Sequence, residues 1–167
     1  MIRAADARER ALEVLRDVMD PEVPVISVVE LGIVRDVELS DDGAVTVVVT
    51  PTYSGCPAMR VIETDIVAAL AAAGFAEARV RTVYSPAWTT DWISDEAREK
   101  LRRYGIAPPP RAHADELVPL LRRSPPTECP FCGSLDTAMR SEFGSTACKA
   151  LLYCHACRQP FELFKGI

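Results

Sequence analysis

The chain has no long apolar segment. Although 49% of its 167 residues are hydrophobic, no run approaches the roughly 18 consecutive apolar residues that a membrane-spanning helix needs. The first ten residues, MIRAADARER, carry a charge every few positions and therefore lack the apolar stretch of a signal peptide. These absences predict a soluble, cytoplasmic protein that does not bind membranes.

Basic residues are also too few for a nucleic-acid-binding surface. The chain has 19 lysines and arginines against 24 aspartates and glutamates, a net charge of −5. Residues 1–119 carry 13 basic and 20 acidic side chains, whereas residues 120–167 carry 6 and 4. An acidic body repels phosphate backbones, and the mildly basic tail has no dense basic stripe. We expect protein partners and no nucleic acid.

Histidine is scarce, and two catalytic signatures are missing. The two histidines, His113 and His155, lie in the tail half of the chain, and neither is well placed to act as a base for a nucleophile elsewhere. No carboxylate–histidine pairs at helical spacing indicate a di-iron centre, and no glycine-rich fingerprint indicates a flavin or nicotinamide site. The sequence therefore predicts that this chain is not itself an enzyme.

Hydrophobic periodicity predicts a compact α/β body of the α+β kind. Helical spacing covers residues 6–19 and 57–73, alternating apolar residues indicate strands at 33–39, 44–50 and 78–83, and a capped helix follows over 94–104. The order is α-β-β-α-β plus a helix. The glycine in DDG at 41–43 favours a hairpin turn between the first two strands. Arg79 and Arg81 are expected to face solvent.

Proline-rich segments divide the chain. We expect a body at residues 1–105, a linker at 106–127 with a short helical stretch near 115–121, and a small domain at 128–167. The small domain contains two CxxC pairs separated by 21 residues. Two such turns bring four thiolates to one ion, which is typical of a zinc ribbon, and a fourfold protein shell leaves no open position for catalysis. The expected zinc ligands are Cys129, Cys132, Cys154 and Cys157.

Cys56 is the candidate reactive residue of the body. It lies in residues 50–57, TPTYSGCP, between a predicted buried strand and the second helix. With Pro57 at the first helical position, Cys56 is expected at the cap, where backbone amides and the helix dipole lower the pKa of a thiol. The residues favour a metal or cluster role over a nucleophile, and a thiol simply packed under the helix is the alternative. Hydroxyl donors are available from Thr50, Thr52 and Ser54.

Several other residues are candidates with weaker sequence signals. Asp20 and Glu22, in the loop DPEVP, are possible helper ligands or solvated residues after a helix end. Trp88 and Trp92 are expected to pack on the core, with a partner surface as the alternative. Cys148 in the small domain is either buried or a second exposed thiol able to pass metal or sulfide.

Several motifs together resemble known families. The segments DPEVP at 20–24, LGIV at 31–34 and TPTYSGCP at 50–57 resemble the SufT-type family of iron-sulfur assembly proteins. The segments WTTDW, GIAPP, CPFC, FGSTACK and CHAC extend the likeness to the PaaD (PaaJ) family of accessory proteins in the bacterial phenylacetyl-CoA epoxidase system. The resemblance covers almost the whole chain.

This resemblance implies a role in aerobic phenylacetate breakdown. It implies an accessory factor that supplies or repairs the iron-sulfur centre of the system's reductase component, with contacts to the oxygenase components. Cys56 matches the family's functional cysteine, and Asp20 and Glu22 match its acidic motif. The implied cofactors are structural zinc and a transient iron or iron-sulfur cluster. A structural adaptor that transfers no metal, and a thiol enzyme acting on the CoA thioester, remain alternatives.

Overall fold

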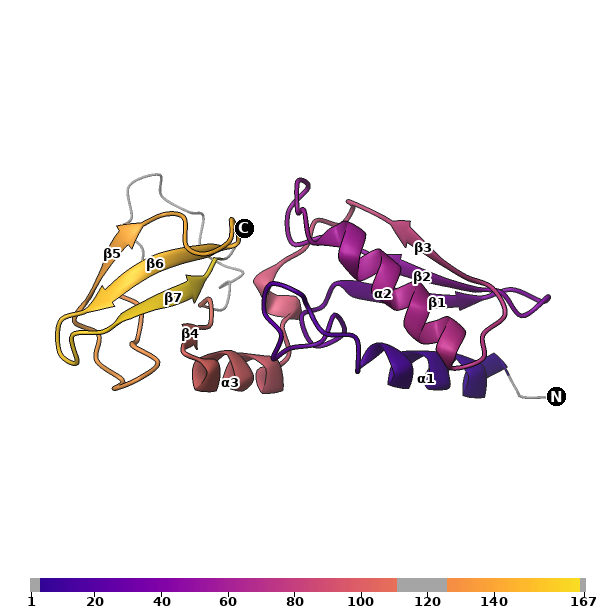
Figure 1. Cartoon of the computed structure of the whole chain (residues 1–167), viewed down its shortest axis with the longest axis horizontal. Helices are drawn as coiled ribbons and strands as arrows, with labels where there is room; N and C mark the ends of the chain where they lie inside the picture. Colours follow the sequence, from indigo (N-terminus) through magenta and orange to yellow (C-terminus); the bar gives the residue numbers. More distant parts are fainter. Residues whose placement is uncertain (1–3, 111–125, 166–167) are drawn as a thin grey trace. The chain divides into compact units, whose positions relative to one another are not determined.

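A computed structural model describes residues 4–110 and 126–165 of the protein (Figure 1). Its contacts form two compact units, one up to Ala97 and one from Arg98 onward. The helical stretch expected near residues 115–121 lies outside the described residues. Within the described ranges, no helix is both long and apolar enough to cross a bilayer.

The first unit packs two helices against a three-stranded sheet, in the expected α-β-β-α-β order (Figure 1). β1 pairs antiparallel with β2, and β2 pairs parallel with β3, so the sheet order is β1-β2-β3. The parallel pairing requires a crossover, which α2 provides. The elements are α1 (Ala4–Leu15), β1 (Val34–Leu39), β2 (Val45–Val49), α2 (Met59–Ala72) and β3 (Ala78–Thr82).

The core of this unit lies between α2 and the sheet. β2 is the central strand, and its four valines are buried, which suits the preference of β-branched residues for the middle of a sheet. α2 buries one stripe at helical spacing and leaves Val61 and Val67 exposed. The buried residues of α2 are Met59, Ile62, Ile66 and Leu70.

α1 is shorter than its periodicity predicted. The helix ends at Leu15, not at Met19, and Met19 instead forms an isolated antiparallel bridge with Ser27. The chain folds back here because the backbone of Val28 donates to the carbonyl of Val18 and the backbone of Asp20 donates to that of Ile26. Val18 is therefore buried in the core without being part of the helix, whereas Met19 is exposed.

The tryptophan segment closes one end of the first unit. A 3₁₀ turn, η1, covers Thr90–Trp92. Trp88 is 4% exposed, and its indole Nε1 donates to the carbonyl of Leu31 at 3.0 Å, so the expected core packing is confirmed for Trp88. Trp92 is half-buried, and the guanidinium of Arg35 lies 3.3 Å from the centre of its ring.

α3 (Asp95–Tyr104) has the predicted ends. The Ser94 hydroxyl accepts from the backbone N–H of Ala97 at 3.0 Å, and Gly105 follows the helix with φ +89°. Inside the second unit, the Arg98 guanidinium donates to the carbonyl of Pro109 at 2.6 Å. This bond fixes the chain directly after the helix.

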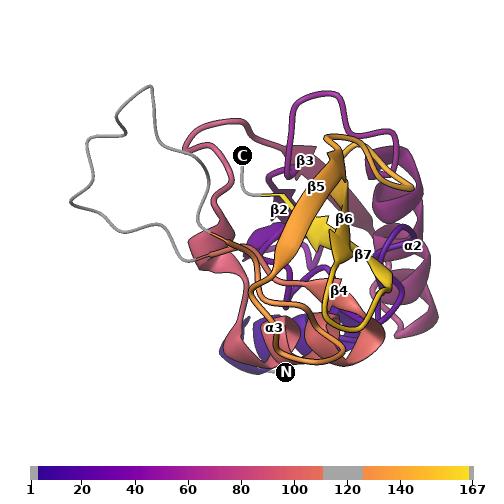
Figure 2. The ribbon, with the colours of Figure 1, turned by 90° about the vertical axis from the view of Figure 1, so that its left-hand side faces the viewer.

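The second unit contains a four-stranded sheet in the order β4-β7-β6-β5 (Figure 2). β5, β6 and β7 form an antiparallel meander, and the short β4 adds parallel to β7. The domain limits expected from the sequence stay predictions, but residues 106 and 107, expected in a linker, form β4. The strands are β4 (Ile106–Ala107), β5 (Thr137–Ser141), β6 (Lys149–Cys154) and β7 (Pro160–Phe164).

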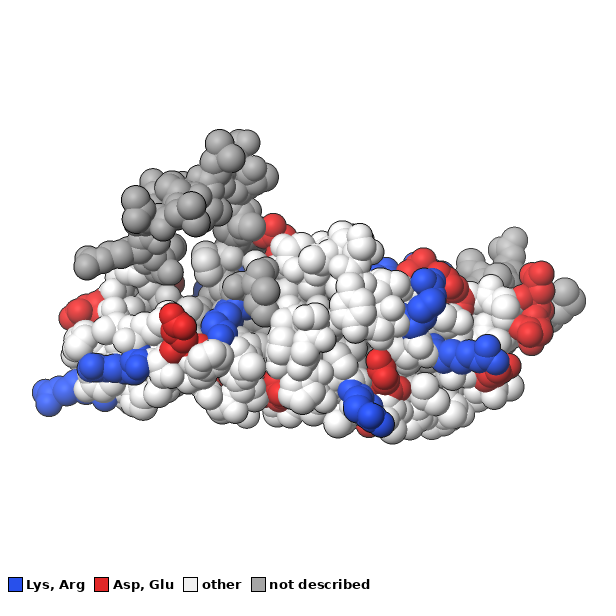
Figure 3. Space-filling view, turned by 90° about the horizontal axis from the view of Figure 1, so that it is seen from above, with Lys and Arg blue, Asp and Glu red and all other residues white. Residues whose placement is uncertain are grey.

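Charged side chains of both signs are mixed over the surface. Figure 3 shows lysines and arginines among aspartates and glutamates on the face that it draws, without a continuous basic area. In the first unit, Arg79 and Arg81 are exposed, as expected, and form ion pairs with Glu77 and Glu38. Exposed pairs of this kind contribute about 0–1 kcal/mol each.

Gly32 should be a sensitive position in the first unit. Its φ is +75°, and a β-carbon there would lie 2.6 Å from Cβ of Trp92 and 2.7 Å from the Trp92 carbonyl oxygen. We expect Gly32→Ala to lower the free energy of unfolding by about 3 kcal/mol, through positive-φ strain and steric overlap. Urea unfolding followed by tryptophan emission measures this, because both tryptophans lie in the first unit.

Gly43→Ala is the matched control. Gly43 also has a positive φ, +86°, but no atom lies within 4 Å of the added carbon. The control should cost about 1 kcal/mol, from backbone strain alone. Equal losses in the two variants would show that the approach of Trp92 to Gly32 does not contribute to stability.

Candidate functional site

Cys56 lies in the loop between β2 and α2. The backbone N–H of Cys56 donates to the carbonyl of Tyr53 at 3.2 Å, which closes a turn. α2 begins at Met59, and its N-cap is Ala58, which has helical backbone angles and no side-chain cap. The expectation that Cys56 is the cap and Pro57 the first helical residue is therefore wrong. The turn at residues 57–58 places the thiol slightly before the helix.

The thiol nevertheless reaches the start of the helix. The backbone N–H groups of Ala58 and Met59 lie near enough to its sulfur to lower the pKa of the thiol. Cys56 is half-buried, so its thiol is only partly enclosed. The N–H of Met59 also donates to the carbonyl of Cys56 at 3.3 Å, which closes the turn before the helix. Amides at a helix start favour a negative charge, so a thiolate or a metal-bound sulfur would be stabilised here.

The pKa of Cys56 is raised, and the lowered value expected from sequence is wrong. Burial raises this pKa most strongly, the Ala58 amide opposes it, and the negative charges of Glu22 and Asp20 raise it further. The sequence argument considered only the helix start. It omitted the carboxylates, which lie more than thirty residues earlier in the chain. The resting thiol is therefore protonated near neutral pH.

The acidic loop is brought to the thiol by its own hydrogen bonds. Oδ1 of Asp20 accepts from the backbone N–H groups of Glu22 and Val23, both at 2.8 Å. Asp20 is 6% exposed, so the alternative of a solvated acid does not hold for this residue. Because both carboxylates act on the pKa of Cys56, the structure brings together these three predicted site residues.

The neighbouring threonines are buried, but they do not bond to the sulfur. Thr50 is 1% exposed and Thr52 is 7% exposed. The backbone N–H of Thr50 donates to the carbonyl of Ile33, whereas its hydroxyl oxygen has no hydrogen-bond partner in the described part of the chain. Ser54 is exposed. The expected hydroxyl donors thus line the loop without contacting the thiol directly.

The four tail cysteines form one cluster in the second unit. Their sulfurs all lie within 4.8 Å of one another, with 3.7 Å between Cys129 and Cys157 and 3.6 Å between Cys132 and Cys154. A tetrahedral zinc ion with bonds of about 2.3 Å requires sulfurs about 3.8 Å apart. The donor set fits zinc, and the two shortest printed separations match this spacing.

Each pair of cysteines is held by a tight turn. The backbone N–H of Gly133 donates to the carbonyl of Cys129 at 2.9 Å, and Gly133 has φ +74°. The second turn joins β6 to β7, where the N–H of Cys154 donates to the carbonyl of Gln159 at 3.0 Å. The backbone N–H of Cys157, together with hydrogen bonds from the thiols of Cys157 and Cys132, lowers the pKa of Cys154 to about 7, whereas burial and the bond with Cys154 raise the pKa of Cys157 to about 12. Without an ion, Cys154 therefore ionises before Cys157, and the thiolate is the form that binds a metal.

Cys148 lies outside this cluster. It is 5% exposed, and its sulfur lies 3.1 Å from the hydroxyl oxygen of Thr146. The burial alternative is therefore confirmed, and an exposed second thiol is excluded for this conformation. The sulfur is not one of the four that could hold a metal ion.

A buried ion pair in the second unit was not predicted. Nζ of Lys149 lies 3.2 Å from Oε2 of Glu162, with the lysine side chain 5% exposed. The other carboxylate oxygen accepts from the backbone N–H of Ser145 at 2.6 Å, which anchors the loop before β6. No sequence spacing indicates this pair, because it depends on the register of β6 against β7.

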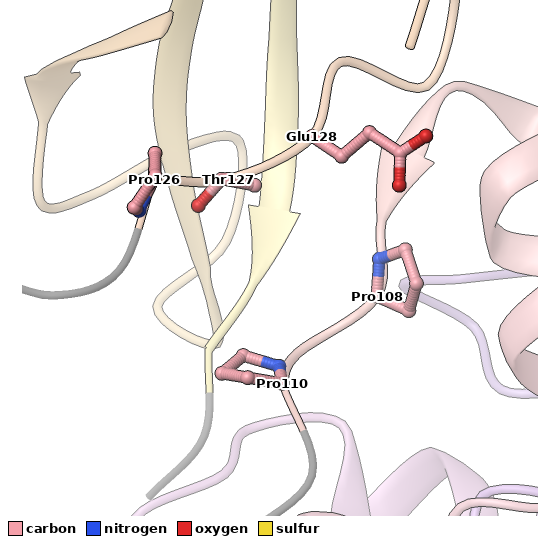
Figure 4. A pocket seen from close by; sticks show the side chains of 5 residues that line it. All are labelled: Pro108, Pro110, Pro126, Thr127 and Glu128. Atoms are coloured by element: carbon pink, nitrogen blue, oxygen red, sulfur yellow. The ribbon is translucent and has the colours of Figure 1, made fainter. Parts of the chain in front are cut away.

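The described residues that line a hollow of about 140 Å³ in the second unit include no thiol or imidazole. Proline rings and a threonine line most of it, and Glu128 supplies one carboxylate (Figure 4). A single carboxylate without a histidine or cysteine offers neither a metal site nor an acid–base pair. The lining residues are Pro108, Pro110, Pro126, Thr127 and Glu128.

Both parts of the chain match known protein families. A family model described as "Iron-sulfur cluster assembly protein" matches residues 8–83. A second, described as "PaaD zinc beta ribbon domain", matches residues 114–165. The first match contains Cys56 with its acidic loop, and the second contains the four-cysteine cluster.

Curated relatives agree with these matches. The chain is 46% identical over 153 residues to an Escherichia coli protein described as a putative subunit of 1,2-phenylacetyl-CoA epoxidase, covering 92% of this chain and 89% of that protein. It is 35% identical to the Bacillus subtilis "Fe-S protein maturation auxiliary factor YitW", over 54% of this chain and 89% of the relative.

A solved structure shares the fold of the first part. The Bacillus anthracis crystal structure described as a "Domain of Unknown Function DUF59" superposes with a TM-score of 0.55 at 27% identity, covering 58% of this chain and 92% of that one. Together with the relative that aligns over 92% of the chain, these matches show that the protein belongs to the PaaD family, in which an iron-sulfur assembly domain is joined to a zinc ribbon.

Proposed function

We propose that this protein is an accessory factor that matures an iron-sulfur component of a phenylacetyl-CoA epoxidase system. Cys56 is the residue that transiently holds the iron or the cluster. One observation carries the proposal. In the assembly domain, two backbone amides and the carboxylates of Asp20 and Glu22 lie close enough to the half-buried thiol of Cys56 to shift its pKa. Names of the relatives support the same role, because they describe an epoxidase component and Fe-S maturation factors.

The electrostatics of the site suit a cation as cargo. Asp20 and Glu22 raise the pKa of Cys56 because their negative charge favours a bound proton over a bare thiolate. The same charge favours an iron cation, which takes the place of the proton on sulfur as the thiol ionises. The carboxylates are hard oxygen donors that can complete the coordination of iron. Cargo that leaves the site is replaced by a proton.

The four tail cysteines have a different role in this proposal. They hold a structural zinc ion through Cys129, Cys132, Cys154 and Cys157, and a closed shell of four sulfurs leaves no position for catalysis. The ion stabilises a ribbon whose buried apolar residues are few. We assign client recognition to this unit and take the reductase component as the client, with the oxygenase components as further partners.

Catalysis by the chain itself is not part of the proposal. A thiol with a raised pKa is largely protonated near neutral pH and is a weak nucleophile. His155 is exposed in the second unit, between Cys154 and Cys157, and His113 lies outside the described residues. The alternative, a structural adaptor that transfers no metal, is distinguished from the proposed role by replacing Cys56.

The first experiment replaces the thiol. In cells that produce the complete epoxidase system, Cys56→Ser should reduce the iron and sulfide content of the purified reductase to a small fraction of the wild-type content. The matched control Cys148→Ser changes a buried thiol outside both sites and should leave that content unchanged. A reductase with its full cluster in the Cys56→Ser strain would contradict cargo transfer and support the adaptor role.

Metal content tests the ribbon. The purified chain should contain about one zinc ion, and Cys129→Ser or Cys154→Ser should abolish binding and unfold the second unit, because the ion supplies much of its stability. Tryptophan emission should not change, since Trp88 and Trp92 lie in the first unit. Cys148→Ser should retain the zinc. Loss of zinc in the Cys148 variant would contradict the assigned ligand set.

The pH dependence of alkylation tests the environment of Cys56. The rate of modification by iodoacetamide, followed on the Cys56 peptide by mass spectrometry, should have its midpoint above pH 9.0, since the pKa is raised from that ordinary value. Glu22→Gln removes a negative charge that disfavours the thiolate, so the midpoint should move to lower pH. Glu38→Gln changes an exposed carboxylate on β1 and should not move it. Equal midpoints in wild type and Glu22→Gln would exclude the acidic loop as the cause.

A further inference from the structure

We propose that the free edge of β3 binds an extended partner segment in which acidic and apolar residues alternate. β3 is the last strand in the order β1-β2-β3 and lies at the margin of the sheet (Figure 1). Among residues 4–110 and 126–165, no strand pairs with its outer side. None of its residues belongs to the Cys56 site, and the cysteine cluster is part of the other unit.

The outer side of β3 presents backbone groups that no strand of the described residues pairs with. The N–H of Val45 donates to the carbonyl of Glu77, and the N–H of Val83 donates to the carbonyl of Val49. Because ladder bonds alternate along a strand, the odd-numbered residues from 77 to 83 face β2. The even-numbered residues, 78, 80 and 82, therefore direct their N–H and C=O groups outward. An extended segment can pair with them as a fourth strand.

A hollow next to this edge can receive side chains from the added strand. It has a volume of about 390 Å³ and is lined by Glu63, Thr64 and Val67 of α2 and by Val80 of β3. Val67 is 37% exposed. The Thr82 hydroxyl donates to Oε1 of Glu63 at 3.0 Å, which ties the helix to the strand there. Apolar side chains on one face of the incoming strand would cover Val67 and Val80.

The opposite face of β3 determines the charge of the partner. Arg79 and Arg81 point away from α2 and are exposed. Their ion pairs with Glu77 and Glu38 are exposed too and therefore weak. Opposite charges on neighbouring strands stabilise pairing, so acidic residues of the partner belong on this face. The segment thus alternates acidic and apolar residues.

The other edge of the sheet is already blocked. Nε of Arg8 on α1 donates to the carbonyl of Val37 on β1 at 3.2 Å, and the same guanidinium bonds Asp36 at 2.8 Å. The register of β1 against β2 also shifts between Val34 and Asp36, which disturbs the edge. Natural sheets are protected by such devices. β3 lacks a covering side chain of this kind in the described part of the chain.

A second copy of this chain is a poor occupant for the β3 edge. Antiparallel pairing of two β3 strands about Val80 would place Arg79 of each copy opposite Arg81 of the other. Like charges directly opposite each other destabilise a strand pair. The charge pattern therefore selects a different, acidic chain, and self-association is an outcome that would contradict the proposal.

The experiment measures binding of synthetic peptides to the full chain by fluorescence anisotropy. The probe is a labelled nine-residue peptide of alternating glutamate and valine, and the controls are a lysine–valine peptide and a glutamate–valine peptide of scrambled order. The alternating acidic peptide should bind about tenfold more tightly than either control, because only its sequence places a glutamate beside both Arg79 and Arg81.

Charge reversal tests the assigned face. Arg79→Glu combined with Arg81→Glu changes exposed side chains only and should invert the preference, so that the lysine–valine peptide binds more tightly. N-methylation of alternate peptide amides should remove binding, because it removes the strand-pairing donors. Cys56→Ala should bind the acidic peptide as the wild type does, which separates this test from that of the proposed function. An unchanged preference in the double variant, no binding of the acidic peptide, or dimers of the wild-type chain in sedimentation would overturn the proposal.

Discussion

The Asp20 carboxylate fixes the turn on which the thiol site depends. By accepting two backbone N–H bonds at 2.8 Å, it folds the segment after α1 back along Val18 and Val28. Hydrogen bonds to an ionised acceptor are stronger than neutral ones, and this carboxylate is largely shielded from water. The same turn sets Glu22 near Cys56. The Asp20 turn therefore determines both the path of the backbone and the negative charge near the thiol.

The two cysteine sites differ in the number of sulfurs and in the charge around them. Cys56 is a single thiol with a raised pKa, two amides and two carboxylates nearby, which suits reversible binding of a cation. The ribbon cysteines are four sulfurs at the spacing of a tetrahedral ion, which suits permanent binding. Separate units hold them, each with its own sheet. Under the proposed function, this difference lets the chain release its cargo while it keeps its structural ion.

Much of the fold follows from local sequence signals. The stripe of α2, the Gly43 turn, the ends of α3 and the two CxxC turns were predicted because each depends on residues within a few positions of one another. Features that depend on residues far apart in the chain could not be predicted from the sequence. The early end of α1, the raised pKa of Cys56 and the Lys149–Glu162 pair arise from contacts between separated segments. Asp20 and Glu22 were expected from the sequence to act near Cys56, but the sequence did not indicate that burial and their negative charge raise the pKa of the thiol.

The central claim is that Cys56 and its acidic neighbours hold iron or a cluster, separately from the zinc ribbon. The most direct measurement is the iron, sulfide and zinc content of this chain purified without oxygen, with Cys56 intact and with Cys56 replaced by alanine. The account predicts zinc in both proteins, and iron in the intact protein alone. Equal iron content in the two proteins, or none in either, would contradict it.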